Sequence, residues 1–138
     1  MRLQLALNVR DLDQAVSFYE ALFGTQPHKR RPGYANFAIE EPPLKLVLFE
    51  NPNASERLNH LGVEVAREEE LAEATQRLQR AGLVEEIQNE STCCHATQDK
   101  VWVREPDGLR FEWYRITNDQ PVTTQEAGVC CARPESPA

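Results

Sequence analysis

Hydrophobic and polar positions follow the same succession twice along the chain. Apolar residues alternate with polar ones over residues 3–9 and again over residues 58–65, and this period of two predicts a β-strand in each place. Each strand is followed by apolar residues at helical spacing, over residues 12–23 and 68–81, which predicts two amphipathic helices. The repeat therefore predicts two similar half-chains.

Residues at the ends of both helical segments agree with these bounds. Asp11 is followed three residues later by Gln14, which is a capping-box arrangement, and Gly24 stands where the first helix would end. The second segment starts with acidic residues and finishes with basic ones, which suits the helix dipole, and Gly82 follows it. Each helix is thus expected to be specified by its own local sequence.

Short apolar or alternating runs bounded by turn residues predict the remaining strands. In the first half-chain they are residues 34–39, residues 44–49 and a short strand around residues 26–30. In the second half-chain they are residues 84–88, either 96–99 or 101–103, and 109–115. Each half therefore predicts the element order β-α-β-β-β.

The predicted fold class is α+β, with two βαβββ modules forming one curved mixed sheet whose concave face is the natural cavity. At 138 residues the chain is long enough for a single compact domain. We expect that domain to cover residues 1–116, with modules at 1–50 and 57–116. From residue 117 the composition is polar, which predicts a flexible tail over residues 117–138 that carries Cys130 and Cys131.

The repeat places two polar side chains at equivalent positions. When the two strands are aligned on Val9 and Val65, Gln4 corresponds to His60. Strand alternation should bury Leu3, Leu5 and Leu7 beneath the helices and leave Gln4 and His60 on the concave side of the sheet.

Glu112 lies between Phe111 and Trp113 in the last predicted strand, so it can point to the same side. An imidazole, a carboxylate and an amide oxygen suit a divalent first-row metal ion and leave coordination positions open. Gln4, His60 and Glu112 are therefore candidate metal ligands. The alternative, equally compatible with the pattern, is that each is a polar residue on a half-exposed sheet.

Composition and charge argue against a nucleic-acid-binding protein and against a membrane-spanning one. The formal net charge is −7, and no basic cluster exceeds the triplet at residues 29–31, which argues against nucleic acid as a partner. No apolar run is long enough to span a membrane, and the N-terminus enters a strand without a signal peptide. We expect a cytoplasmic protein, monomeric or homodimeric, that acts on a small molecule.

The four cysteines stand as two adjacent pairs, Cys93-Cys94 and Cys130-Cys131. A disulfide between neighbours is strained and closes almost no loop, so structural bridging is a poor explanation. Paired thiols indicate binding of a soft metal or metalloid, or redox chemistry. Cys93 and Cys94 are the candidate binding pair, although two buried small apolar residues would give the same sequence.

Several segments resemble the vicinal oxygen chelate superfamily of glyoxalases, extradiol dioxygenases and bleomycin-resistance proteins. The opening Asn-Val-x-Asp-Leu-x-x-Ala-x-x-Phe-Tyr at residues 8–19 is similar to that superfamily. Segments at residues 32–37, 58–62, 92–94 and 98–100 resemble one branch of it, which contains the organoarsenical C–As bond lyases and the cadmium-induced proteins. The resemblance extends to about residue 116.

The resemblance implies the vicinal oxygen chelate fold and an Fe(II)-dependent, O₂-using lyase that removes the organic group from trivalent organoarsenicals in arsenic resistance. It implies that Gln4, His60 and Glu112 bind the metal and that Cys93 and Cys94 bind the arsenic. Some members of this branch have His at the position of Gln4. Two alternatives stay open: a non-catalytic protein that binds cadmium or arsenite, and a thiol transferase or antibiotic-binding relative.

Overall fold

The computed structural model describes residues 1–93 and 95–120. The chain forms two compact units, Arg2–Leu61 and a second unit that starts at Gly62. The boundary falls inside strand β5 (Leu58–Val65), and not in the linker that separates the predicted modules 1–50 and 57–116. No helix of the described residues is long and apolar enough to cross a membrane.

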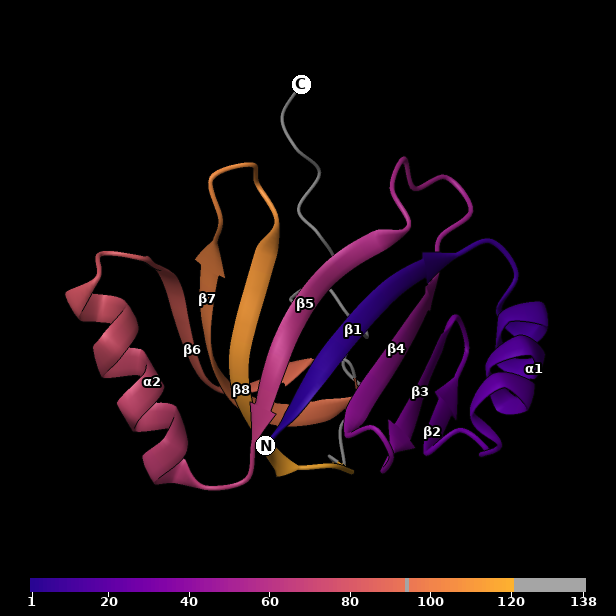
Figure 1. Ribbon diagram of the computed structural model, residues 1–138, viewed down its shortest axis with the longest axis horizontal. Coiled ribbons are helices and arrows are strands. Elements are labelled where there is room, and N and C mark those ends of the chain that lie inside the picture. The colour runs from indigo at the N-terminus through magenta and orange to yellow at the C-terminus, as the bar shows by residue number, and fades with distance from the viewer. Residues whose placement is uncertain (94, 121–138) are drawn as a thin grey trace. The chain divides into compact units, whose positions relative to one another are not determined.

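The first unit contains one helix and strands that pair side by side in a sheet (Figure 1). Its elements before β5 are β1 (Arg2–Val9), α1 (Leu12–Phe23), β2 (Lys29–Arg31), β3 (Tyr34–Ile39) and β4 (Leu44–Glu50). The strand order is β2-β3-β4-β1. Strands β2, β3 and β4 pair antiparallel, whereas β1 pairs parallel to β4.

Helix α1 begins and ends at the residues that the sequence indicates. The Asp11 carboxylate accepts a hydrogen bond from the backbone N–H of Gln14 at 3.0 Å, as an N-cap should. Gly24 closes the helix in the left-handed conformation, with φ of 65°. Leu12 and Val16 on the inner face pack with Phe37 and other apolar residues of the strands, forming the core of this unit.

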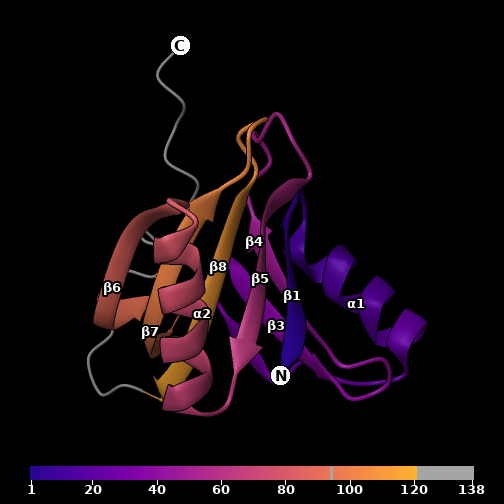
Figure 2. The same cartoon turned by 60° about the vertical axis from the view of Figure 1, so that its left-hand side comes forward.

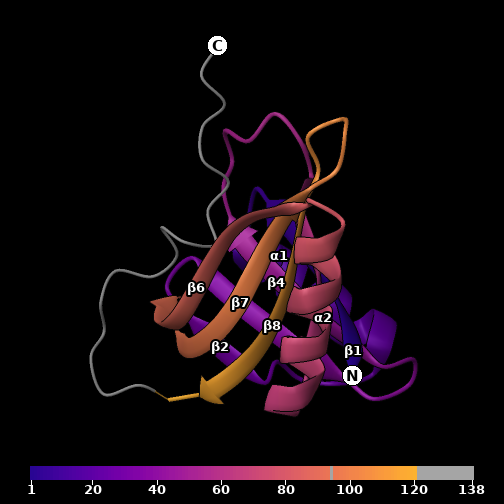
Figure 3. The same ribbon diagram turned by 90° about the vertical axis from the view of Figure 1, so that its left-hand side faces the viewer.

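The second unit repeats the succession of elements. After β5 come α2 (Glu68–Arg80), β6 (Val84–Cys93), β7 (Ala96–Arg104) and β8 (Arg110–Asn118). Strands β8, β7 and β6 lie side by side and pair antiparallel. Helix α2 lies along these strands and contacts β8 and β6 (Figures 2 and 3). Leu71 of the helix belongs to a core cluster with Val65 and Val101.

The predicted β-α-β-β-β order is confirmed in both halves, but the region around residue 90 differs from prediction. Residues 96–99 and 101–103, taken as alternatives, belong to one strand, β7. Strand β6 runs on to Cys93 instead of ending near residue 88. Pairing with β7 extends β6 through polar residues of low strand propensity, with register shifts around Glu90.

The predicted burial of the leucine face of β1 is wrong for Leu3, which is 50% exposed. Leu5 and Leu7 do pack against the core of the first unit, but they are only partly buried. The opposite face of the strand, which carries Gln4 and Asn8, is fully buried. Alternation predicts which residues share a face, but it does not predict how completely each face is covered.

The predicted end of the domain at residue 116 is two residues short. Strand β8 continues to Asn118, and the Thr117 hydroxyl donates to the backbone carbonyl of Thr97 at 3.2 Å. This pairing with β7 orders two polar residues that composition alone places in the tail. The rest of the predicted tail, including Cys130 and Cys131, lies outside the described residues.

Candidate metal centre

Two of the predicted metal ligands are in direct contact within the first unit. Gln4 lies on β1 and His60 on β5, and the Gln4 Nε2 atom is 3.1 Å from the His60 Nε2 atom. Both side chains are buried, with exposed fractions of 4% and 3%. Residues that are 56 positions apart in the sequence thus meet away from water.

The other edge of the His60 ring contacts a neighbouring amide. The Nδ1 atom is 2.8 Å from Oδ1 of Asn59, which in turn donates through Nδ2 to Oδ1 of Asn8 at 3.0 Å. Asn8 donates through its own Nδ2 to the backbone carbonyl of Glu56 at 2.9 Å. The ring is therefore held from one side by a line of amides, while its Nε2 atom faces Gln4.

The sequence pattern does not identify Asn59 or Asn8 as part of the site. A buried Asn beside a candidate His on an otherwise apolar strand is the signal that would have included Asn59, since buried amides require hydrogen-bond partners. The connection to Asn8 is not visible in the sequence, because the two residues are 51 positions apart.

Glu112, the third predicted ligand, lies on β8 in the second unit and forms an ion pair with Lys100 of β7. The Lys100 Nζ atom is 2.8 Å from Oε2 of Glu112, and the side chains are 0% and 2% exposed. The ammonium group also lies 5.3 Å from the ring centroid of Trp102 and 5.8 Å from that of Tyr114. A buried carboxylate is tolerated here because a buried cation compensates its charge.

Of the predicted arsenic-binding pair, only the backbone of Cys93 is described. Cys93 is the last residue of β6, where it pairs with Ala96 of β7. Cys94 lies outside the described residues. The assignment of both thiols therefore stays a prediction from the sequence.

The side chains of Gln4, His60 and Glu112 carry donor groups of the kind that divalent metal ions bind. The imidazole of His60 has one nitrogen bonded to an amide oxygen and the other turned to a second polar side chain, as is usual for metal-binding histidines. Gln4 of the same unit carries an amide, and Glu112 of the second unit carries a carboxylate. In the described part of the chain, no three His, Cys, Asp or Glu side chains form a metal-binding group. These residue types fit a first-row divalent ion.

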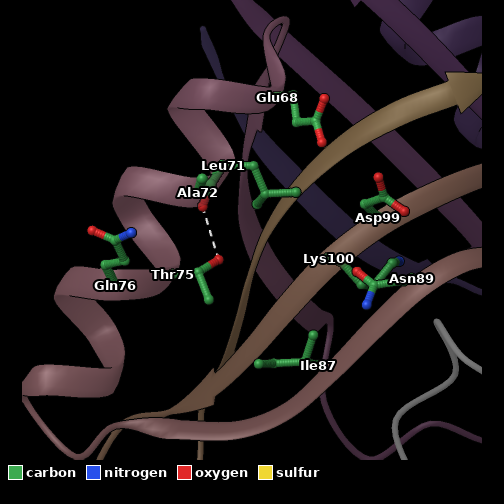
Figure 4. Close-up of a pocket in the computed structure, with 9 residues that line it drawn as sticks. All are labelled: Glu68, Leu71, Ala72, Thr75, Gln76, Ile87, Asn89, Asp99 and Lys100. Carbon is green, nitrogen blue, oxygen red and sulfur yellow. Dashed lines mark hydrogen bonds between the residues drawn. The ribbon is translucent and has the colours of Figure 1, made fainter.

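A pocket of about 310 Å³ lies between α2 and strands β6 and β7 of the second unit (Figure 4). Leu71 and Thr75 line it from the helix, and Ile87, Asn89 and Asp99 line it from the strands. The Thr75 hydroxyl donates to the Leu71 carbonyl at 2.8 Å, so it is already engaged within the helix. None of the described residues that line this pocket is a predicted metal ligand.

Comparison with known proteins agrees with the βαβββ repeat. Residues 3–113 match the family described as Glyoxalase/Bleomycin resistance protein/Dioxygenase superfamily. The chain belongs to this superfamily, and its α+β architecture of two βαβββ modules is the vicinal oxygen chelate fold.

Two relatives cover nearly the whole chain. A protein of Mycobacterium bovis named cadmium-induced protein CadI is 51% identical over 94% of this chain and 92% of its own length. A protein of Thermomonospora curvata named trivalent organoarsenical cleaving enzyme is 48% identical over 96% of this chain and 89% of its own length.

Among solved structures, the Mn(II)-bound glyoxalase from Novosphingobium aromaticivorans is similar, with a TM-score of 0.61. It is 18% identical, and the match covers 89% of this chain and 42% of the glyoxalase chain. At this identity the similarity concerns the fold.

Proposed function

We propose that this protein is an Fe(II)-dependent enzyme that uses O₂ to cleave the C–As bond of trivalent organoarsenicals and releases inorganic arsenite. The structural observation that supports this proposal most is the buried contact between Gln4 and His60, because it brings together two candidate ligands from distant strands. The 48% identity to a trivalent organoarsenical cleaving enzyme supports the choice of substrate.

In this proposal Gln4, His60 and Glu112 hold the metal ion. His60 contributes the lone pair of Nε2, Glu112 a carboxylate oxygen, and Gln4 its amide oxygen after rotation of the amide group that now turns nitrogen toward His60. Bound Fe(II) would supply the activation of O₂. Lys100 holds the carboxylate of Glu112 through its ion pair, which limits the rotamers that Glu112 can adopt.

Cys93 and Cys94 hold the substrate in this proposal. Two adjacent thiolates chelate As(III), since sulfur is a soft donor and trivalent arsenic is a soft acceptor. Chelation fixes the position of the organic group and turns a chance encounter into an oriented reaction. Methylarsenite and O₂ together contain the atoms of arsenite and formaldehyde, so the carbon is oxidised, the arsenic stays trivalent, and no external reductant is needed.

A second function is favoured by one specific observation, the 51% identity to a cadmium-induced protein. The cysteine pairs would then sequester cadmium or arsenite without turnover, in a reducing cytoplasm that keeps the thiols free. The two functions differ in their products, because sequestration returns the organoarsenical unchanged.

The test separates the two sets of ligands. Cys93→Ser and Cys94→Ser should each abolish arsenite release from methylarsenite while Fe(II) binding persists, because serine has little affinity for As(III). His60→Ala should abolish arsenite release and leave methylarsenite binding intact. His28→Ala is the matched control, since His28 has no role in the proposed site, and it should release arsenite like the parent. Tight binding of methylarsenite without any arsenite release would contradict the proposal.

A further inference from the structure

Three amide and carbonyl groups lead to His60 in an unbroken line of hydrogen bonds. The line starts at the backbone carbonyl of Glu56, passes through the side chains of Asn8 and Asn59, and ends at the Nδ1 atom of His60. Asn8 and Asn59 are both 5% exposed, so the line runs almost out of contact with water. Each member therefore depends on its neighbours for hydrogen bonding.

The direction of every hydrogen bond in this line follows from its first member. A backbone carbonyl only accepts, so Asn8 must turn its NH₂ group toward Glu56, at 2.9 Å. The Asn8 oxygen Oδ1 then faces Asn59, so Asn59 must donate through its own NH₂ group. The distance from Asn59 Nδ2 to Asn8 Oδ1 is 3.0 Å. Asn59 in turn presents oxygen to His60, at 2.8 Å, and an oxygen acceptor requires that Nδ1 carry the proton.

Backbone hydrogen bonds of Asn8 fix its position next to the Glu56 carbonyl. Its N–H donates to the carbonyl of Arg57 at 2.7 Å, and its carbonyl accepts from the Arg57 Nε atom at 3.0 Å. Asn8 is thus bonded to the segment before β5 through its backbone as well as its side chain. A reversal of the Asn8 amide would place two carbonyl oxygens face to face at Glu56, which is unfavourable in a buried site.

Gln4 lies on the opposite side of the ring and agrees with this direction. Its amide nitrogen, a donor only, faces the Nε2 atom of His60 at 3.1 Å. A donor at that position requires a lone pair on Nε2, which is what protonation at Nδ1 leaves in the neutral ring.

We infer that Asn8 and Asn59 are positioning residues that fix His60 in the tautomer protonated at Nδ1, with the Nε2 lone pair directed toward Gln4. They act through the hydrogen bond to the Nδ1 atom of His60. The consequence for metal binding rests on the proposed function: a ring held in this tautomer presents a ready donor, and loss of such support typically lowers metal affinity about 10–100-fold.

The tautomer is measured on the metal-free protein by long-range ¹H–¹⁵N correlation NMR with ¹⁵N-labelled histidine. The chain has three histidines, and the signals that disappear in His60→Ala identify His60. In the parent, Nδ1 should resonate as a protonated nitrogen and Nε2 as an unprotonated one. Asn59→Leu should shift the population toward the Nε2-protonated form, whereas Asn59→Asp should retain the parent pattern because its carboxylate still accepts from Nδ1.

Asn8→Ala gives a second, independent variant in which the Asn59 amide is free to rotate, and it should yield a mixture of tautomers. Asn36→Ala is the matched control, because Asn36 is a buried asparagine of the same unit that bonds to Tyr34 and not to this line. It should leave the His60 signals unchanged. A parent spectrum with Nε2 protonated, or an unchanged tautomer in both Asn59→Leu and Asn8→Ala, would overturn the inference.

Titration with Mn(II), followed by the loss of its free-ion EPR signal, distinguishes this inference from the proposed function. Affinity should fall about 10–100-fold in Asn59→Leu and further in His60→Ala. If both variants bind Mn(II) like the parent while the tautomer shifts as expected, the metal centre is wrong and the positioning of His60 stands. If His60→Ala loses Mn(II) but Asn59→Leu changes neither tautomer nor affinity, the positioning role is wrong.

Discussion

Lys100 and Glu112 form an ion pair in which Nζ lies 2.8 Å from Oε2 and the two side chains are 0% and 2% exposed. Removal of one partner leaves a buried charge uncompensated, so Lys100→Met and Glu112→Gln should each destabilise the protein by about 3–5 kcal/mol. The double variant should be destabilised by less than the sum of the two single variants, because it removes both charges of the pair. Urea unfolding of the parent and the three variants measures this coupling.

The exposed pair of Arg67 and Glu70 serves as the control for this prediction. Its Nε–Oε1 distance is 3.0 Å, but the Arg67 side chain is 68% exposed, so solvent screens the interaction. Arg67→Ala should therefore change the free energy of unfolding far less than Lys100→Met does. Equal effects of the two substitutions would contradict the view that burial makes the Lys100–Glu112 pair important.

The end of β8 sets how far the chain can be shortened. A chain that ends at Gln120 keeps the hydrogen bond from Thr117 to the Thr97 carbonyl and the pairing of Asn118 with Thr97, so it should unfold like the full chain. A chain that ends at Ile116 loses both and should be destabilised by about 1–2 kcal/mol. The chain that ends at Gln120 should release arsenite like the full chain. If the chain that ends at Gln120 failed to fold, residues 121–138 would be needed for the fold.

Glu105 makes the turn between β7 and β8 sensitive to acid. The backbone N–H groups of Asp107 and Leu109 donate to its carboxylate, and they hold the pKa of Glu105 below its ordinary value. Because the pKa is lowered on folding, this stabilisation is present above the ordinary glutamate pKa of about 4.3 and disappears as the pH falls through the lowered value.

Glu105→Gln removes this titration and keeps an oxygen that can accept the same hydrogen bonds. The stability difference between the parent and Glu105→Gln at pH 7 should therefore shrink as the pH falls below the ordinary glutamate pKa of about 4.3 and through the lowered value. Glu40→Gln, at an exposed turn, controls for the general effect of removing one negative charge. A difference that stays constant from pH 7 to pH 3 would show that the turn does not depend on the charged form of Glu105.

Elements with local signals could be predicted from the sequence. Helix α1 has its cap at Asp11, its apolar face and its closing Gly24, and all three agree with the structure. Strands β3 and β5 have the predicted bounds, because short apolar runs between turn residues define them locally. The element order then followed from the repeat.

Features that depend on distant partners could not be predicted in this way. Asn89 and Glu90 have low strand propensity and fall in the register shift between Gln88 and Ser91, the β6 residues that pair with β7 on either side of them. The Glu90 N–H donates to the Asp99 side chain at 2.7 Å. The amide line from Asn8 to His60 likewise joins residues far apart in sequence. Residue types identified the candidate ligands, and their supporting contacts required the fold.

The stoichiometry of arsenite release tests most directly whether this protein cleaves the C–As bond. Purified protein with Fe(II) is mixed with methylarsenite, and O₂ consumption and inorganic arsenite are followed together. We predict one arsenite released for each O₂ consumed, with formaldehyde as the carbon product and with neither arsenite nor O₂ uptake in His60→Ala. Methylarsenite that binds to the parent protein and is recovered intact, with no O₂ consumed, would contradict the account.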